Sequence, residues 1–451
     1  MNHGDALSLH AIRPCLEGAI PAIAATCDPD GTPNVAYISQ VVYVDEAHVA
    51  LSFQFFNKTR QNILRNPHAA VLVLDPVTAR FYRLHLLYER TEDSGPVFES
   101  MRAQLAGIAS HAGMAGVFEL KGADIYAVER IEAVAGDGLP PPPPRSGLLH
   151  ALRICSESIA RCTGLDELVQ GVLAGLQEQL GIEHAMVLML DASTQQLYTV
   201  ASCGYPTSGV GSEIRLGQGV IGMAARERTP VRISHMTHAA LYSHAIRESM
   251  DAHAAPDAPS LRGLDIPYPG LPEPHSQVAV PLVSAARLLG VLFAESPEDM
   301  RFGFEDEDVL VTLAGQLAAA IDLLQAAPDA PEPASSLAAA PPVTGSALRV
   351  RHFAANDSVF INDDYLIKGV AGAIFWKLLR DHQQTGRVDF TNRELRLDPA
   401  LRLPDVADNL EARLLLLQRR LQENSPHIHI ERTGRGRFRL CVLRPVLLED
   451  A

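Results

Sequence analysis

The stretch Gly138-Leu139-Pro140-Pro141-Pro142-Pro143-Pro144-Arg145-Ser146 places five consecutive prolines about a third of the way along the sequence. Proline lacks a backbone N–H and has a fixed φ, so this run is typical of a stiff polyproline spacer. Residues 326–346 predict a second, flexible linker, because they mix Ala, Pro, Ser and acidic residues with no hydrophobic period. The linkers at 139–146 and 326–346 divide the chain into three domains, which we place at residues 10–134, 147–325 and 347–445.

The composition is that of a globular protein with several domains. The chain has 451 residues, of which 47% are hydrophobic and 20% are charged. No segment approaches the roughly 18 to 20 uninterrupted apolar residues that a membrane span needs. The start, Met1-Asn2-His3-Gly4-Asp5, has no basic region followed by an apolar core, so we expect no secretory signal. The six cysteines form no C-x-x-C pair, which favours a cytoplasmic protein with reduced thiols.

Strand and turn signals alternate through the first domain. In the turn Asp28-Pro29-Asp30-Gly31, proline presets φ and glycine permits a positive φ. Helical spacing of apolar residues is confined to two segments of this domain. We expect strands at 20–26, 34–44, 48–55, 69–75, 79–89 and 123–131, and helices at 57–66 and 96–109.

This domain resembles the pyridoxamine 5′-phosphate oxidase-like split barrel, a flavin-binding family. The resemblance lies in Asp28-Pro29-Asp30-Gly31-Thr32-Pro33 of the first hairpin and in Phe56-Asn57-Lys58-Thr59-Arg60-Gln61-Asn62-Ile63 after the third strand. It implies that a basic residue opening the helix binds the phosphate of FMN, and a helix N-terminus beside a cation is also a sound phosphate site on physical grounds.

The resemblance also implies which residues hold the cofactor. It assigns Lys58 and Arg60 to the phosphate with Asn62 nearby, and it leaves Ser39 and Gln40 as the polar residues of the second strand. Haem is the alternative cofactor, since the family includes haem binders as well as members without any cofactor. The domain closes on Glu129-Arg130-Ile131-Glu132 in place of basic residues, so pyridoxamine phosphate oxidation itself is not expected.

The middle domain combines a helical period over residues 148–179 with strands expected at 185–191 and 197–203. Four signatures follow in order, and the last opens a helix that we expect to reach residue 324. They are Gly217-Gln218-Gly219-Val220-Ile221-Gly222, Gln277-Val278-Ala279-Val280-Pro281-Leu282, Leu289-Gly290-Val291-Leu292-Phe293-Ala294-Glu295-Ser296 and Phe304-Glu305-Asp306-Glu307-Asp308-Val309-Leu310. Together they resemble a GAF domain, a small-molecule sensory α/β fold, over residues 147–325.

A histidine-rich insertion precedes the second of these signatures. Its histidines are His235, His238, His244, His253 and His275. Neutral imidazole suits zinc and iron, but no carboxylate or cysteine completes a closely spaced set, so we assign no metal site. The resemblance implies that this region caps a ligand pocket, and we expect an organic ligand or anion there, with Tyr242, Arg247 and His275 as contacts. No Ser-His-Asp or paired-carboxylate spacing is present, so no catalytic residue is assigned.

The C-terminal domain is basic in an otherwise acidic chain. Residues 348–444 hold 17 Lys and Arg against 12 Asp and Glu, whereas the chain as a whole has a net charge of −15. We expect strands at 350–353, 358–361, 428–431 and 438–442, and helices at 369–382, from Thr391, and at 410–424. In the last helix Leu410, Leu414, Leu417 and Leu421 are expected to point inward and Arg413, Arg419 and Arg420 outward.

This order of elements resembles the winged-helix DNA-binding domain of OmpR-type response regulators. The resemblance rests on residues 409–421 and on Thr433-Gly434-Arg435-Gly436-Arg437-Phe438-Arg439-Leu440. It implies a recognition helix that carries Arg413, Arg419 and Arg420, and a wing that places Arg435 and Arg437 on the DNA backbone. Asp408 and Glu411 oppose phosphate contact, and Leu415 and Leu416 widen the apolar face, so a basic domain that binds a partner protein is the alternative.

The sequence therefore predicts an α+β multidomain protein with a split β-barrel, a GAF α/β sensory domain and a winged helix. We expect a cytoplasmic one-component transcriptional regulator, a homodimer that senses a small-molecule or redox signal and binds promoter DNA. A non-catalytic sensor is expected, and the main alternative is a flavin-dependent oxidoreductase of the split-barrel family with regulatory GAF and winged-helix domains. A scaffold with a degenerate barrel and a protein-binding winged helix is the third interpretation.

Overall fold

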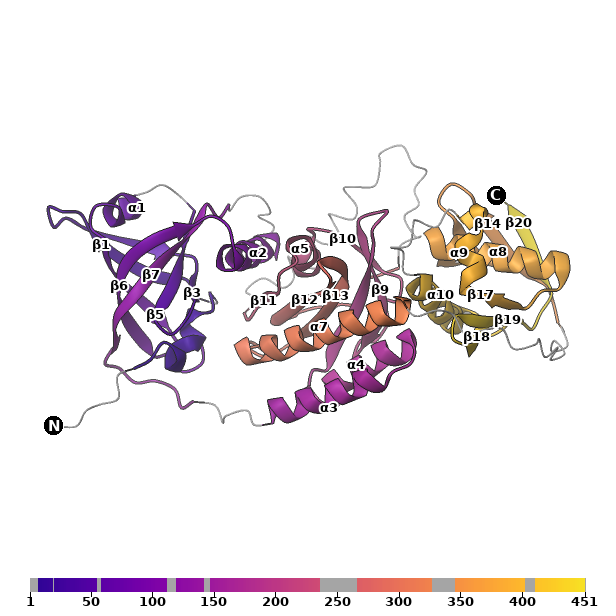
Figure 1. The fold of residues 1–451 in the computed structure, drawn as a ribbon, viewed down its shortest axis with the longest axis horizontal. Coiled ribbons are helices and arrows are strands. Elements are labelled where there is room, and N and C mark those ends of the chain that lie inside the picture. Colours follow the sequence, from indigo (N-terminus) through magenta and orange to yellow (C-terminus); the bar gives the residue numbers. More distant parts are fainter. Residues whose placement is uncertain are drawn as a thin grey trace.

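Three sheet-based domains lie in a row in the computed structural model (Figure 1). The structure describes residues 7–18, 20–54, 58–111, 119–141, 147–235, 266–326, 345–401 and 410–450. We call the three bodies the N-terminal, middle and C-terminal domains. Most of the predicted linkers, at 142–146 and 327–344, fall outside the described residues. Among the described residues, no helix is long and apolar enough to cross a membrane.

The N-terminal domain is a curled antiparallel sheet of seven strands in the order β2-β1-β5-β6-β7-β4-β3. Alternate residues of β1 and β5, such as Ala24, Val71 and Val73, are fully buried, and they line a core with the short helix η1 (His10–Leu16). The strands are β1 (Ala22–Cys27), β2 (Pro33–Ile38), β3 (Val41–Tyr43), β4 (His48–Phe53), β5 (His68–Leu74), β6 (Phe81–Glu92) and β7 (Gly122–Ala133), with helices α1 (Lys58–Ile63) and α2 (Pro96–His111).

The middle domain is a six-stranded sheet in the order β10-β9-β8-β13-β12-β11 with helices on both faces. Successive residues of β8 point to opposite faces. Ala185 and Val187 pack under α3, α4 and α7, while Met186 and Leu188 pack under α5. Its elements are α3 (Leu148–Arg161), α4 (Leu165–Leu180), β8 (His184–Asp191), β9 (Gln196–Cys203), β10 (Glu213–Arg215), α5 (Gly219–Glu227), β11 (Val231–Ile233), β12 (Ser276–Ser284), β13 (Arg287–Ser296) and α7 (Phe304–Ala326).

Helix α2 joins the first two domains. It belongs to the N-terminal domain, but Ala103 is fully buried in the core that lies beneath α5 of the middle domain. Gly107 approaches Val231 so closely that an added Cβ would lie 2.7 Å from a valine methyl carbon. Arg102 adds an ion pair with Glu227 at 2.6 Å. The two domains therefore share a packed interface.

A buried arginine lies in the same interface. Arg232 of β11 pairs with Glu17 at 2.6 Å and with Glu307 of α7 at 2.7 Å. The side chains of Arg232 and Glu17 are only 8% and 7% exposed. Burial raises the pKa of Glu17, and the Arg232 guanidinium opposes that rise. The charge of Glu17 is thus tolerated inside the interface because Arg232 faces it.

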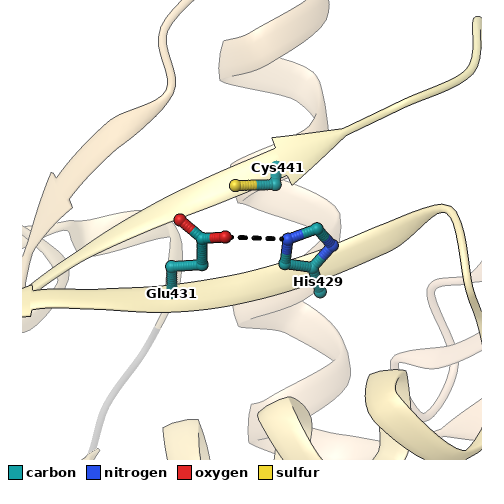
Figure 2. A group of neighbouring side chains, drawn as sticks. All are labelled: His429, Glu431 and Cys441. Carbon is teal, nitrogen blue, oxygen red and sulfur yellow. Dashed lines mark hydrogen bonds and ion pairs between the residues drawn. The ribbon is translucent and has the colours of Figure 1, made fainter. Parts of the chain in front are cut away.

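The C-terminal domain has two sheets around the long helices α8 and α10. One sheet has the order β16-β15-β14-β20, with β14 and β20 parallel, and the other has the order β17-β19-β18. On the hairpin of β18 and β19, His429 and Cys441 lie directly across from each other, and Glu431 follows on the same strand (Figure 2). The elements are β14 (Leu348–Phe353), β15 (Ser358–Ile361), β16 (Asp364–Ile367), α8 (Gly369–Thr385), β17 (Asp389–Thr391), α9 (Asn392–Leu397), η2 (Pro399–Leu401), α10 (Leu410–Asn424), β18 (Ile428–Gly434), β19 (Arg437–Val442) and β20 (Val446–Asp450).

Several predicted elements differ from the observed ones for identifiable reasons. The single strand expected at 34–44 is two strands, β2 and β3, which lie at opposite edges of the sheet. The helical period over 148–179 belongs to two helices, α3 and α4, because Cys162 and Gly164 between them have extended φ and ψ that do not continue a helix. The helix start predicted at Thr391 is confirmed, because Thr391 and Glu394 form a reciprocal capping box.

We expect Arg232→Met to lower the free energy of unfolding by about 3–5 kcal/mol, because it leaves Glu17 buried without its partner. Arg102→Met is the matched control, since the Arg102 side chain is 46% exposed and an exposed pair contributes at most about 1 kcal/mol. Urea unfolding of both variants measures the difference. Equal midpoints for Arg232→Met and Arg102→Met would contradict the buried-pair role of Arg232.

Candidate functional site

A cavity of about 100 Å³ lies inside the curled sheet of the N-terminal domain. Polar residues that line it include Thr26 of β1 and Ser39 and Gln54, which directly follow β2 and β4, together with the aromatic rings of Phe53 and Tyr126. Within the described part of the chain, the buried Oε1 of Gln54 has no hydrogen-bond partner. An unsatisfied buried acceptor in a polar cavity is the kind of group that a ligand or an ordered water satisfies.

Arg60 of α1 is the one predicted phosphate ligand that lines this cavity with a positive charge. Its guanidinium is 2.5 Å from Asp124 of β7 and also donates to Thr91 at 2.8 Å. The Phe53 ring lies 4.4 Å from the same guanidinium. Burial raises the pKa of Asp124, and both Thr91 and Arg60 oppose that rise. The cation of the cavity is therefore balanced by a carboxylate of the same domain.

The other predicted cofactor residues do not form a cationic cluster with Arg60. Lys58 lies outside the cavity and pairs with Asp28 at 3.2 Å. Asn62 is buried and donates to Thr26. Ser39 lines the cavity and accepts a hydrogen bond from Gln54, whereas Gln40 is buried elsewhere and donates to Gln104 of α2.

In the observed conformation, the described lining offers a flavin phosphate one cation, Arg60, which is already paired with Asp124. A phosphate monoester carries close to two negative charges at neutral pH, and it would meet an Arg60–Asp124 pair without net charge. For haem, the described residues that line the cavity include no His, Cys or Met, although Tyr37 and Tyr126 are present.

In the middle domain, the structure tests only part of the predicted ligand set. Tyr242 and Arg247 lie outside the described residues. His275 is at the surface and pairs with Asp299 at 3.3 Å, and His235 bonds to the same carboxylate at 2.7 Å. The ligand role of His275 stays a prediction.

Sequence reasoning missed Glu295, a deeply buried carboxylate of the middle domain. It is 1% exposed, and its two oxygens accept hydrogen bonds from the backbone of Leu271 and from the side chain of Gln277. Burial raises its pKa. An acidic residue inside the apolar run of β13 is the signal that could have identified it.

Helix α10, the predicted recognition helix, is docked on the middle domain. Arg413 pairs with Asp191 at the end of β8 at 2.7 Å and lies over the ring of Tyr198 at 4.5 Å. Arg419 donates to the carbonyl oxygen of Val200 on β9 at 2.5 Å and pairs with Asp166 of α4 at 2.6 Å. Two of the three arginines are thus bound by elements of the other domain.

Arg420 is also buried. It donates to the carbonyl oxygen of Leu366 in its own domain and pairs with Glu423, while Glu423 accepts a hydrogen bond from Ser208 of the middle domain. The expectation that Arg413, Arg419 and Arg420 point outward is wrong for this arrangement, because they are 6%, 8% and 9% exposed. In this state none of them can reach DNA.

The leucines of α10 explain how the helix is buried on two sides. Leu410, Leu414, Leu417 and Leu421 are buried as predicted. Leu415 and Leu416 are buried too, and Leu416 approaches Gly211 of the middle domain. A helix that is apolar on most of its circumference needs two packing partners, here the C-terminal core and the middle domain.

The hairpin between β18 and β19 keeps its basic tip at the surface. Arg435 is exposed and Arg437 is half-buried. Arg435 makes one long hydrogen bond, at 3.4 Å, to the carbonyl oxygen of Leu324 at the end of α7. Of the two acidic residues that weigh against DNA contact, Glu411 bonds to Asn392, and Asp408 lies outside the described residues.

Comparison with known families identifies two of the three domains. Residues 8–129 match the family described as pyridoxamine 5′-phosphate oxidase, and residues 162–322 match the GAF domain family. The chain therefore contains a split barrel of the first kind followed by a GAF domain. Neither match extends beyond residue 322. No curated protein matches the chain.

Solved structures similar to parts of the chain include proteins of several kinds. An FMN-binding protein from Syntrophomonas wolfei is 16% identical, with 28% of this chain and 86% of that chain covered and a TM-score of 0.25. The GAF domain of an Acinetobacter phosphoenolpyruvate-protein phosphotransferase is 20% identical, with coverage of 41% and 99% and a TM-score of 0.31. Free methionine-R-sulfoxide reductase from Neisseria meningitidis is 23% identical, with coverage of 39% and 88% and a TM-score of 0.29.

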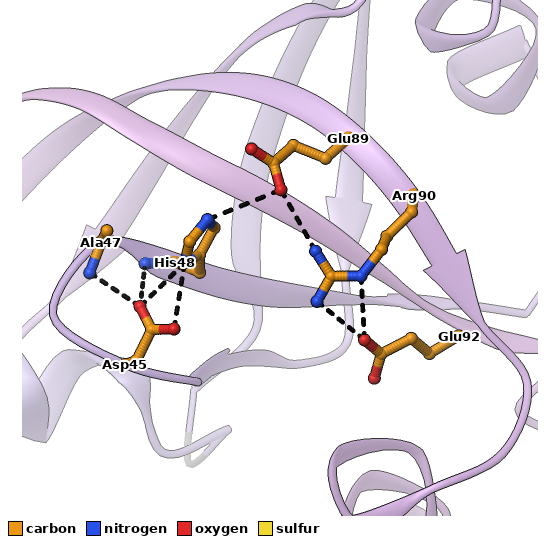
Figure 3. A network of polar contacts seen from close by, with 6 residues as sticks. All are labelled: Asp45, Ala47, His48, Glu89, Arg90 and Glu92. Carbon is orange, nitrogen blue, oxygen red and sulfur yellow. Dashed lines mark hydrogen bonds and ion pairs between the residues drawn. The ribbon is translucent and has the colours of Figure 1, made fainter.

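We expect Asp124→Asn to raise the affinity of the barrel for FMN by about 10-fold or more, because it frees a buried guanidinium to face the phosphate. Quenching of FMN fluorescence on titration with protein measures the affinity. Glu89→Gln is the matched control, because it removes the same charge from the outer surface of the sheet, where Glu89 contacts His48 and Arg90 (Figure 3). Equal affinities in the two variants would show that Asp124 does not oppose the phosphate.

Proposed function

We propose that this protein is a one-component transcriptional regulator whose GAF domain controls the DNA-binding surface of the C-terminal domain. The observation that carries the proposal is the docking of α10 on the GAF domain through Arg413 and Arg419. Helix α10 carries three arginines and lies between a sensory domain and a basic hairpin. In this position, a ligand of the sensory domain could control whether the arginines are available to DNA. The operator would be a promoter sequence that paired half-sites of a homodimer recognise.

Charge and the order of elements support DNA as the partner of the C-terminal domain. Residues 348–444 carry five more basic than acidic side chains, 17 against 12, while the chain as a whole is acidic. Helix α9 leads into α10, and the hairpin of β18 and β19 follows, as in domains that place a helix in the major groove and a hairpin on the backbone. Arg393 and Arg396 of α9 are exposed beside them.

The docked state supports a mechanism of release. Asp191, Val200 and Asp166, which hold the arginines of α10, belong to β8, β9 and α4 of the GAF domain. A ligand that shifts these elements changes the free energy of docking and so the fraction of molecules with a free α10. The signal would be a small molecule or a redox change sensed by the barrel and the GAF domain.

A flavin-dependent oxidoreductase is the second candidate, and the family match of residues 8–129 favours it. The Arg60–Asp124 pair weighs against a bound flavin phosphate, so we rank this function below the regulator. The absorption spectrum of the purified protein, followed by a test for NAD(P)H turnover, separates the two. A flavin spectrum with turnover would establish the enzyme.

We expect Asp191→Asn to raise the apparent affinity for DNA by about 10-fold, because it weakens docking of α10 by roughly 1.4 kcal/mol. Burial opposes the charge of Asp191, yet the Arg413 guanidinium holds the pKa of this carboxyl below its usual value. Asparagine keeps the oxygen that accepts from Ser193 and loses the charge that binds Arg413. Fluorescence anisotropy with a fragment of the protein's own promoter measures the affinity.

Glu178→Gln is the control for this experiment, because it removes one acidic charge from an exposed position on α4 of the same domain. Its affinity for DNA should equal that of the unmodified protein. Lower affinity in Asp191→Asn than in Glu178→Gln would mean that docking does not withhold α10. Absence of DNA binding in every variant would favour a protein partner instead.

We expect the double substitution Arg435→Ala and Arg437→Ala to weaken DNA binding. The slope of log affinity against log salt should fall by about 2, or about 1 for each phosphate that the hairpin no longer binds. The variant Arg80→Ala in the N-terminal domain provides the control for removal of a positive charge far from the hairpin. An unchanged, specific gel shift after the double substitution would refute the assignment of the hairpin as a wing.

A further inference from the structure

One face of the hairpin of β18 and β19 gathers three potential metal ligands. Residues of β18 alternate, so Ile428 and Ile430 point into the core while His429 and Glu431 point away from it. Cys441 of β19 is the direct cross-strand partner of His429. The side chains of His429, Glu431 and Cys441 therefore share one face and lie side by side (Figure 2).

Their donor atoms are close enough for one ion. A nitrogen of His429, an oxygen of Glu431 and the Sγ of Cys441 all lie within 4.8 Å of one another. The Nε2 of His429 is 3.1 Å from the Oε1 of Glu431. In a tetrahedral zinc site, ligand atoms at about 2.0–2.3 Å from the metal are roughly 3.3–3.8 Å apart. Small side-chain rotations would bring the three donors to that spacing.

The charged side chains around His429, Glu431 and Cys441 leave these three residues open to an ion from solvent. Arg439 lies directly across from Glu431, but its guanidinium forms two hydrogen bonds with Asp389, at 2.8 and 3.0 Å. The side chain of Glu431 is 58% exposed and that of His429 is 33% exposed, so an ion can approach from solvent. Cys441 is 8% exposed and forms the inner end of the cluster.

We propose that His429, Glu431 and Cys441 bind one zinc-class divalent cation, with water completing the coordination. A thiolate, an imidazole and a carboxylate are the ligands that zinc takes in proteins, whereas magnesium and calcium require oxygen ligands alone. Three protein ligands and an open position are typical of an exchangeable or reactive site rather than a closed structural one.

A metal role explains this cluster better than oxidation sensing. Redox-sensor cysteines have a lowered pKa and good access to solvent. The side chain of Cys441 is instead largely covered, with 8% exposed. A bound metal would link β18 to β19 and so stiffen the hairpin whose tip carries Arg435 and Arg437.

The test is a cobalt(II) titration of the full-length protein after chelator treatment. We expect one cobalt ion per chain, with a thiolate-to-cobalt charge-transfer band that added zinc abolishes. Cys441→Ser should remove the band, and His429→Gln and Glu431→Gln should each weaken binding by at least about 10-fold. His429→Gln changes a side chain that is 33% exposed, so it keeps the test valid if Cys441→Ser fails to fold.

Two controls identify the site. Cys162→Ser removes a half-buried thiol of the middle domain, and His427→Gln removes a neighbouring imidazole outside the cluster; both should leave binding unchanged. The proposal is wrong if cobalt binds without the thiolate-to-cobalt band, because histidines of the middle domain alone would bind it in that way. A band that persists in Cys441→Ser, or a protein that binds no cobalt, also overturns the proposal.

Discussion

The burial of α10 between two domains is the constraint on which the arrangement of this protein depends. Six leucines cover most of the helix circumference, so one packing surface cannot remove all of them from water and a second is needed. The same burial takes three guanidinium groups out of solvent, which is costly unless each finds a partner. Arg413 and Arg419 find theirs on the GAF domain, so the polar contacts fix the angle and register at which the apolar surfaces meet.

The interface between the barrel and the GAF domain combines the same two kinds of contact, an apolar helix and a buried arginine. Helix α2 supplies the apolar contact through Ala103, and Arg232 with Glu17 supplies the buried pair. A buried pair adds little stability over an apolar contact, but a shifted interface would leave its charges unmatched. Both interfaces of the GAF domain thus combine an apolar helix with a buried arginine–carboxylate pair.

The sequence predicted helices and strands best where interactions between residues close in the chain determine them. The bounds of α10 and β15 and the capping box at Thr391 follow from periodicity and side-chain chemistry within a few residues. It failed where the partner is distant in sequence. Arg413 was assigned to the outer face because its partner, Asp191, lies in another domain, and a period of 3.6 residues cannot show that a second domain covers that face.

The candidate sites show the same limit. Lys58 and Arg60 form a plausible phosphate site when the sequence is considered alone, yet Asp124, 64 residues beyond Arg60, neutralises the cation that lines the cavity. Conversely, His429 and Cys441 have no recognisable ligand spacing, and only the hairpin register brings them together. In β-sheet domains, a binding site combines residues of neighbouring strands. A motif along one strand therefore gives only some of the site residues, and the pairing register determines the others.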